Sequence, residues 1–299
     1  MVEIILHPPA AFSRSHIWDY LKRSTNECLF HVDEESIERL IPTAEGLQLI
    51  RITAAADNDG LAISFPALEK EPTEALQAEA HRYVWDWLDC DRDLAPFFDL
   101  SEQDNVLRDA AKRFYGLRIV GIDDLFEALS WGIMGQQINL TFAYTLKRRF
   151  VERFGTSLEW NGRRYYAFPS PETIAAIEPA ELTAMQFTGR KAEYLIGTAA
   201  ELAEGRLSKE QLLALPDLPA IEKALTRIRG IGPWTANYVI MRCLRMPGAF
   251  PIEDVGLHNA LKHVLQREDK PSIAEIKGLS AGWGEWRSYA TFYLWRLLY

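Results

Sequence analysis

Cysteine is scarce in this sequence, with three residues, Cys28, Cys90 and Cys243, among 299. They lie far apart, and none has the Cys-x-x-Cys or Cys/His spacing that binds zinc or an iron–sulfur cluster. Elsewhere, no His, Asp or Glu group has metal-ligand spacing either. We therefore predict buried, unreactive thiols, no metal bound by side chains and no cofactor.

Long apolar runs are also missing. No stretch approaches the roughly 18 to 20 consecutive apolar residues that a membrane span requires. The first residues, MVEIILHPPAAFSRSH, have neither the basic start nor the small-residue cleavage site of a signal peptide. We expect a cytoplasmic globular protein without a membrane partner, and 299 residues allow two domains.

Positive charge is in deficit, because the formal net charge is -9. Phosphate affinity usually depends on Lys and Arg side chains that displace counterions from nucleic acid. The deficit is confined to residues 1–115, with 11 basic and 22 acidic side chains, whereas residues 116–299 have 22 and 20. A neutral second part is no basic patch, so charge alone does not indicate a DNA partner.

The first third of the chain has β-like patterning. Short apolar runs at residues 28–32, 46–55 and 60–65 are separated by turn signals such as DNDG at 57–60, which predicts an antiparallel sheet. From Pro72 the apolar spacing becomes helical. One face of this helix carries Leu76, Ala80, Tyr83, Val84 and Trp87.

Polar residues and proline become frequent at residues 93–105, and consecutive helices follow. We therefore place a domain boundary near residue 100. The predicted fold class is α+β: residues 1–100 form an antiparallel sheet and helix domain, and residues 101–299 are helical. One hairpin, with Asn161-Gly162 as its turn, is expected at residues 158–168 as an insertion between helices.

The segment LTRIRGIGPWTANYVIMRCL, residues 225–244, predicts two helices joined by a tight turn. Leu225 and Ile228 end the first helix, Gly230-Ile231-Gly232 forms a turn that a Cβ would obstruct, and the second helix begins at Thr235. Backbone N–H groups at such a helix start bind an anion without any cation. Such a turn can therefore bind a phosphate even in an acidic protein. A turn that only connects the two helices has the same motif.

The second informative segment is AFPIEDVGLHNAL, residues 249–261, in which Asp254 directly precedes the apolar run of a new helix. An aspartate there is typical of a helix N-cap. The spacing after the glycine turn, however, resembles the helix-hairpin-helix DNA glycosylase superfamily, and Asp254 matches its catalytic aspartate. The adjacent Glu253 is expected to face solvent, and His258 to be an ordinary surface histidine.

Further matches to this superfamily lie in SWGIMGQQINLTFA, FTGRKAEYLIGTAAELA and EWRSYATFYLW, in chain order. Together with GPWTANY and the N-terminal sheet, they look most like the AlkA-type 3-methyladenine DNA glycosylases. The resemblance implies a helix-hairpin-helix glycosylase core at residues 101–299. It also implies a partner, double-stranded DNA containing alkylated bases, and we expect a monomeric enzyme.

Two differences from other members of the superfamily indicate the type of glycosylase. Bifunctional relatives carry a lysine two residues after the second hairpin glycine, where its amine attacks the sugar, but this chain has Trp234. The four C-terminal cysteines of the iron–sulfur members are missing. We therefore predict a monofunctional enzyme that leaves an abasic site.

Aromatic side chains are suited to a cationic alkylated base, since cation–π attraction is worth roughly 0.5 to 2 kcal/mol. Trp234 and Tyr238 are one helical turn apart, and Trp295 matches a third pocket position of the AlkA type. The alternative is that all three are core aromatics. Trp286 and Tyr289 fit the core better.

The resemblance assigns DNA contacts to Gly230, Ile231, Gly232, Thr235, Gln136 and Gln137. Gln137 stands where AlkA-type relatives have an apolar wedge, and an ordinary helix N-terminal amide is its alternative role. Relatives often hold a monovalent cation on hairpin carbonyls, here near Ile228 and Ile231. Carbonyl ligation leaves no side-chain signature in a sequence.

As the base leaves, Asp254 would stabilise the positive charge that develops on the sugar, or would orient the attacking water. The sequence leaves both roles open. Three rival functions also remain: a glycosylase for an oxidised purine, a non-catalytic DNA-binding module, and a protein whose hairpin is only a structural turn.

Overall fold

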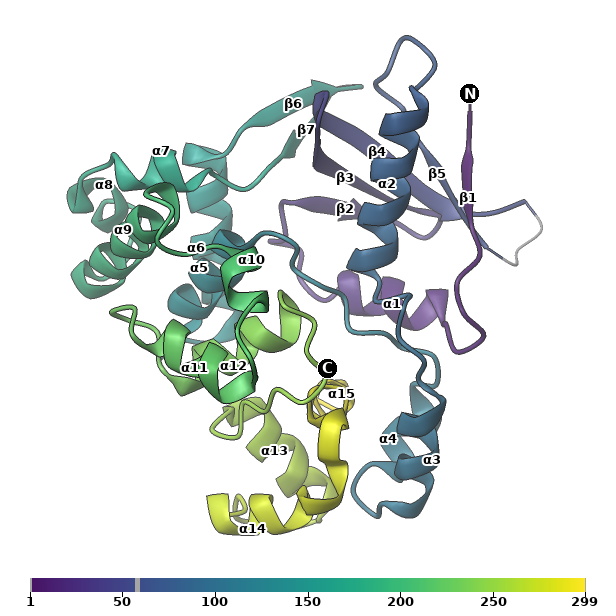
Figure 1. Ribbon diagram of the computed structural model, residues 1–299, viewed down its shortest axis with the longest axis vertical. Coiled ribbons are helices and arrows are strands. Elements are labelled where there is room, and N and C mark those ends of the chain that lie inside the picture. Colours follow the sequence, from purple (N-terminus) through teal and green to yellow (C-terminus); the bar gives the residue numbers. More distant parts are fainter. Residues whose placement is uncertain (1, 57–59, 299) are drawn as a thin grey trace.

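A computed structural model of the chain describes residues 2–56 and 60–298. A five-stranded antiparallel sheet occupies the N-terminal part, and helices make up nearly all that follows (Figure 1). The predicted α+β class is confirmed. The turn expected at DNDG lies largely outside the described residues.

The N-terminal sheet has the strand order β1-β5-β4-β3-β2. Its strands are β1 (Ile4–Leu6), β2 (Phe30–Val32), β3 (Ser36–Thr43), β4 (Gly46–Ala54) and β5 (Leu61–Ser64). The runs at 28–32, 46–55 and 60–65 thus contain β2, β4 and β5. The sequence pattern did not predict β1 or β3.

Two helices accompany the sheet. Helix α1 (Arg14–Leu21) leads toward the helical part, and α2 (Glu74–Trp87) lies across one face of the sheet (Figure 1). The Thr73 hydroxyl caps α2 by accepting from the Leu76 amide at 3.1 Å. Leu76, Ala80, Val84 and Trp87 are buried, which confirms most of the predicted face.

The remaining chain forms the helical part. Its helices are α3 (Ala95–Gln103), α4 (Arg108–Arg113), α5 (Leu125–Gly135), α6 (Leu140–Phe154), α7 (Pro171–Ala175), α8 (Pro179–Thr183), α9 (Gly189–Ala203), α10 (Lys209–Leu213), α11 (Leu218–Thr226), α12 (Pro233–Arg242), α13 (Val255–Val264), α14 (Ile273–Leu279), the 3₁₀ helix η1 (Ala281–Trp286) and α15 (Arg287–Trp295).

The predicted hairpin between helices is present as β6 (Ser157–Trp160) and β7 (Arg163–Tyr166). Asn161 and Gly162 both have positive φ, at 49° and 73°, as a type I′ turn requires. The hairpin extends from the helical part to β3 (Figure 1). There the Tyr165 hydroxyl donates to Glu38 Oε2 at 2.6 Å, so the insertion also joins the two parts of the molecule.

The sheet and the helices share one continuous hydrophobic core. Tyr20 of α1 packs on Phe292 of α15 at a ring separation of 4.8 Å, and Phe97 of α3 packs on Tyr293 at 4.9 Å. Helices α3 and α4 lie beside the C-terminal helices rather than on the sheet (Figure 1). The domain boundary near residue 100 stays a prediction.

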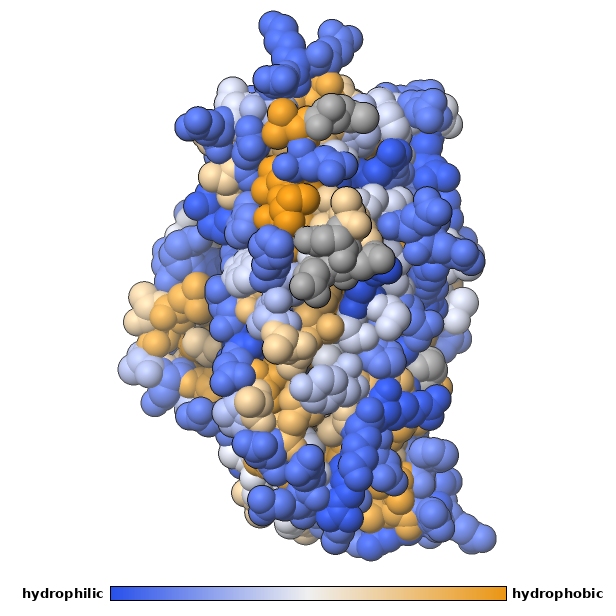
Figure 2. Space-filling view, turned by 90° about the vertical axis from the view of Figure 1, so that its right-hand side faces the viewer, coloured by the Kyte–Doolittle hydropathy of each residue, from blue (hydrophilic) through white to orange (hydrophobic). Residues whose placement is uncertain are grey.

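The face on the side of β1 is mainly hydrophilic, with apolar patches between polar residues (Figure 2). Among the described residues, no helix is both long and apolar enough to cross a membrane.

Cys28, Cys90 and Cys243 are buried and unpaired, as predicted. Within the same ranges, no three His, Cys, Asp or Glu side chains gather where they could hold a metal ion.

Candidate active site at the helix-hairpin-helix

The predicted hairpin is formed by α11, a short turn and α12. The Ile231 amide donates to the Ile228 carbonyl at 3.0 Å and closes the turn. Gly230 has φ +96°, and a Cβ on it would overlap the Tyr194 ring of α9. Gly232 has an ordinary φ of −92° and open space around a hypothetical Cβ. The prediction that a Cβ would obstruct the turn is therefore confirmed at Gly230 and wrong at Gly232.

The start of α12 presents free backbone donors. Gly232 is the N-cap and Pro233, without an N–H, is the first helical residue. The N–H groups of Gly232, Trp234 and Thr235 belong to the first turn, where an α-helix has no internal acceptor for them. The positive end of the helix dipole adds to their attraction for an anion. A helix start of this kind can bind an anion such as a phosphate.

The other predicted hairpin residues point inward. The Ile231 side chain is buried, and the Thr235 side chain is buried against Gly132 of α5. Contacts from these two residues to DNA would therefore run through their backbone. The Ile228 carbonyl already accepts one hydrogen bond, and a monovalent cation beside it stays a prediction.

Asp254 is the N-cap of α13, and its Oδ1 accepts from the Leu257 amide at 2.7 Å. Oδ1 also accepts from Trp295 Nε1 at 2.7 Å, and Oδ2 accepts from Trp234 Nε1 at 2.8 Å. The capping role considered for Asp254 is thus real. It coexists with a half-buried carboxylate held directly beside the hairpin helix.

The three predicted pocket aromatics lie together. The rings of Trp234 and Tyr238 stack at 5.6 Å with an interplanar angle of 25°, and Tyr238 lies 6.4 Å from Trp295. Tyr238 and Trp295 are almost fully buried, whereas Trp234 is partly exposed. These residues are therefore part of the core and border the carboxylate at the same time.

The predicted DNA-contacting glutamines have different surroundings. Gln136 ends α5 and donates from Nε2 to the Gly230 carbonyl at 2.8 Å. Gln137 is exposed and has φ +57°, in the loop before the Asn139 cap of α6. The alternative role of Gln137 as a helix N-terminal amide is therefore wrong. The role of Gln137 as a wedge stays a prediction.

Sequence reasoning missed Arg242 and Tyr20. Arg242, one turn after Tyr238 on α12, is buried and donates from Nη1 to the Tyr238 hydroxyl at 3.2 Å. Its spacing from Tyr238 was a usable signal. Both residues and Tyr20 line a cavity of about 30 Å³ between the sheet and the helices. That volume holds about one or two waters.

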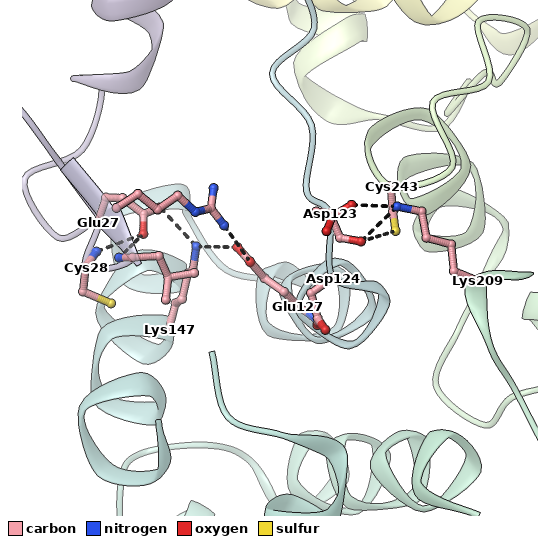
Figure 3. A network of polar contacts seen from close by, with 10 residues as sticks. Glu27, Cys28, Asp123, Asp124, Glu127, Lys147, Lys209 and Cys243 are labelled. Atoms are coloured by element: carbon pink, nitrogen blue, oxygen red, sulfur yellow. Dashed lines mark hydrogen bonds and ion pairs between the residues drawn. The ribbon is translucent and has the colours of Figure 1, made fainter. Parts of the chain in front are cut away.

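The residues that line this cavity include a buried ion-pair network, which is drawn in Figure 3. Lys147 Nζ lies 3.1 Å from both Glu27 Oε2 and Glu127 Oε1, and Arg39 lies 3.7 Å from Glu127. Burial alone would lower the pKa of Lys147, but the two carboxylates outweigh it and raise that pKa above its usual range. Lys147 is therefore a protonated ammonium.

A second cluster in Figure 3 surrounds the start of α5, where Lys209 Nζ contacts Asp123 Oδ1 at 2.9 Å. Burial raises the pKa of the Cys243 thiol to about 12, so this thiol is not nucleophilic.

Near Asp254, Glu253 is exposed as expected. His258 Nε2 donates to the Ile252 carbonyl at 2.8 Å and does not contact the Asp254 side chain.

A glycine hairpin before a helix start, with an aspartate held beside it, defines the class of helix-hairpin-helix proteins with an acidic active site. A family model described as HhH-GPD superfamily base excision DNA repair protein matches residues 131–284. A second model, the 8-oxoguanine DNA glycosylase N-terminal domain, matches residues 23–129. The chain belongs to the HhH-GPD superfamily of base excision DNA repair proteins.

Similarity to individual proteins extends over the whole chain. The chain is 45% identical to a DNA-3-methyladenine glycosylase of Bacillus subtilis (strain 168), over 99% of this chain and 97% of that protein. Its fold matches a 3-methyladenine DNA-glycosylase from Archaeoglobus fulgidus with a TM-score of 0.82 at 23% identity, covering 99% and 98% of the two chains. An 8-oxoguanine glycosylase/lyase from Clostridium acetobutylicum matches with 0.75 at 20% identity, covering 98% and 95%.

Proposed function

We propose that the protein is a monofunctional DNA glycosylase of base excision repair that hydrolyses the N-glycosidic bond of alkylated purines, such as 3-methyladenine and 7-methylguanine. The 45% identical Bacillus subtilis protein has the name of this activity, and the two chains match over nearly their full lengths. The substrate is alkylated duplex DNA, and we propose a cytoplasmic monomer.

One observation carries this proposal: the hydrogen bond of 2.8 Å from Trp234 Nε1 to Asp254 Oδ2. Trp234 lies in the first turn of the helix whose N–H groups can hold a DNA phosphate. The contact therefore ties the phosphate site and the carboxylate together. A phosphate bound at the hairpin would bring its own deoxyribose close to Asp254.

Base flipping precedes the chemistry, because an enzyme cannot reach a glycosidic bond inside the stack. Extrusion of a nucleotide costs about a few kcal/mol, and less where damage already weakens pairing. Gln137 would fill the gap that the base leaves, since it is exposed before α6. The phosphate at Gly232 and Trp234 would hold the rotated backbone.

In the chemical step the bond between C1′ and the base nitrogen breaks, and its electron pair leaves with the base. The sugar then has oxocarbenium character, and the anionic Asp254 would stabilise it more than it stabilises the ground state. Water adds its oxygen to C1′ and releases a proton. The products are a free base and an abasic site.

Strand cleavage by a lyase step needs an amine that attacks C1′. The hairpin position that carries a lysine in bifunctional enzymes is Trp234 here. Lys147 lines the nearby cavity, but two carboxylates keep it protonated, so it offers no free electron pair. We therefore propose hydrolysis without strand cleavage.

The test is incubation of the protein with duplexes that contain one 7-methylguanine, 3-methyladenine or 8-oxoguanine. We expect free methylated bases, intact strands until alkali is added, and no covalent complex after borohydride treatment. Release of 8-oxoguanine alone would replace the proposal by the oxidised-purine function. Salt-sensitive DNA binding without any base release would indicate a non-catalytic module, and sedimentation of the protein as a dimer would contradict the monomer.

A further inference from the structure

Positive charge gathers where the start of α9 meets the hairpin turn. Residues 186–196 and 226–237 contain one acidic side chain, Glu193. Their basic side chains are Arg190, Lys191, Arg227 and Arg229. The two segments are in contact, because a Cβ on Gly230 would overlap the Tyr194 ring. The whole chain has a net charge of -9, so this excess of positive charge is local.

The four basic side chains differ in their surroundings. Arg190 and Arg227 are exposed, and within the part of the chain that the structure describes neither forms an ion pair. Lys191 is buried and donates from Nζ to the Met134 carbonyl at 2.8 Å. The two exposed arginines are therefore accessible to an anionic partner, whereas Lys191 is held inside the protein.

Arg229 is also exposed, but its charge is already matched. Its Nη2 lies 3.1 Å from Glu193 Oε2, and the two side chains are 77% and 50% exposed. The Arg229 Cζ lies 5.6 Å from the centre of the Tyr194 ring. Because the same ring abuts Gly230, the guanidinium stands next to the glycine turn. The one carboxylate of the two segments thus pairs with the cation that directly precedes the turn.

An ion pair of this kind is easily exchanged. In water it contributes little to stability, because both charges can be hydrated and two long side chains lose freedom. A guanidinium binds phosphate with the same forked geometry as carboxylate. Each strand of a duplex carries a phosphate for about every 3.4 Å of helix axis. A strand held at the start of α12 would therefore bring further phosphates to the turn.

We propose that Arg229 binds a phosphate of the DNA strand that passes the hairpin, and that it leaves Glu193 to do so. This inference rests on the proposed function, in which the hairpin holds DNA. After the exchange, the carboxylate of Glu193 stays beside the duplex and repels its phosphates. Glu193 therefore weakens binding to damaged and undamaged DNA alike, because phosphate contacts do not depend on the bases.

The experiment measures how the affinity of the full chain for DNA depends on salt. Two duplexes are used, one undamaged and one with a tetrahydrofuran nucleotide, and binding is followed by fluorescence anisotropy. Each phosphate contact contributes about 0.9 to the slope of log affinity against log salt concentration. Arg229→Gln should therefore make the slope less steep by about 0.9. From about 50 to 200 mM salt, the wild type should lose about 3.5 times more affinity than this variant.

Two further variants separate charge from exchange. Arg229→Lys keeps the positive charge and should restore the wild-type slope. Glu193→Gln leaves Arg229 without a carboxylate to leave, so we expect binding to both duplexes to become about twofold to fivefold tighter, the strength of one exposed ion pair. The slope of Glu193→Gln should be at least as steep as that of the wild type.

The pair of Arg206 and Glu201 provides matched controls. Arg206 Nη2 lies 2.9 Å from Glu201 Oε1, and both side chains are exposed. This pair lies toward the other end of α9, a helix of 15 residues that is about 22 Å long. R206Q and E201Q change the net charge as R229Q and E193Q do. Both controls should keep the wild-type slope and affinity.

The slope does not depend on the fraction of folded protein, which changes the apparent affinity equally at every salt concentration. A wild-type slope for R229Q would overturn the inference, and so would an equal reduction for R206Q. An unchanged affinity of E193Q would overturn the exchange. In all three cases base release by the wild type would still support the proposed function. A wild type that shows neither salt-dependent binding nor base release would overturn both.

Discussion

The side-chain amide of Gln136 donates a hydrogen bond to the main-chain carbonyl of Gly230 at 2.8 Å, across 94 residues of sequence. The contact joins the loop between α5 and α6 to the turn of the hairpin. The same nitrogen lies 3.5 Å from Thr235 Oγ1. The loop with the exposed Gln137 and the glycine turn of the hairpin, where we propose that a phosphate binds, are therefore held together.

Gln136→Met tests this connection, because methionine keeps the length of the side chain and removes the donor. We expect about a fivefold to tenfold weaker affinity for a tetrahydrofuran duplex, since a net hydrogen bond contributes about 1 kcal/mol. The affinity is measured by fluorescence anisotropy. Binding equal to that of the wild type would mean that the hairpin needs no support from Gln136.

Gly230 and Gly232 should respond differently to alanine. Gly230→Ala places a Cβ in the Tyr194 ring at positive φ, and we expect a loss of about 1–3 kcal/mol in the free energy of unfolding. Gly232→Ala meets open space and should leave thermal unfolding unchanged. We expect it to weaken DNA binding, because the added Cβ would stand beside the N–H groups that we propose hold a phosphate. Equal destabilisation of the two variants would contradict this distinction.

Gln137→Ala is expected to slow single-turnover base release about tenfold or more, because the gap in the duplex is no longer filled during flipping. Gln266→Ala is the matched control: Gln266 is also exposed with positive φ, but it follows α13. Its release rate should equal that of the wild type. A normal rate for Gln137→Ala would assign the wedge to another residue.

The ion pairs of Lys147 predict a pH dependence of stability. Burial raises the pKa of Glu27, but the Lys147 ammonium and the Leu29 amide outweigh it, and the pKa of Glu27 lies below its ordinary value of 4.5. The stabilisation from Glu27 is therefore present above about pH 4.5 and is lost as the pH falls through the folded-state pKa.

Glu27→Gln should lower the free energy of unfolding at pH 7 by about 2 kcal/mol, since Lys147 keeps only Glu127 as its buried partner. The difference from the wild type should shrink below about pH 4, as measured by urea unfolding. The exposed pair of Arg148 and Glu152 is the control, and Glu152→Gln should cost less than about 0.5 kcal/mol. A constant difference from pH 7 to pH 3 would contradict the assigned charge of Glu27.

The elements that could be predicted from the sequence are those whose patterns depend on residues close together in the chain. The hairpin at Gly230 and the cap at Asp254 depend on neighbouring residues, and both could be read directly from their segments. Strand β3 escaped prediction because Glu38 and Arg39 interrupt its apolar pattern. Both are buried, and their charges are balanced by residues distant in sequence, such as Arg51 and Glu127.

The arrangement around the candidate site could be predicted only in part. Trp234, Tyr238 and Trp295 were expected to form a pocket, but the donation of both indoles to Asp254 depends on how three helices pack. A Cβ on Gly256 would lie 2.8 Å from Asp254 Oδ1 and 3.2 Å from Trp295 Nε1, and this crowding is visible only when the Trp295 ring is in place. The contributions of Tyr20 and Lys147 required the fold of the N-terminal part against the helices.

The central claim is that the charge of Asp254 drives the release of an alkylated base. The most direct test compares the single-turnover release of 7-methylguanine by the wild type and by Asp254→Asn, a nearly isosteric variant that retains an oxygen for the Leu257 amide. We predict a rate at least about a hundredfold lower for the variant, with unchanged affinity for a tetrahydrofuran duplex. Release at the wild-type rate by Asp254→Asn would contradict the account.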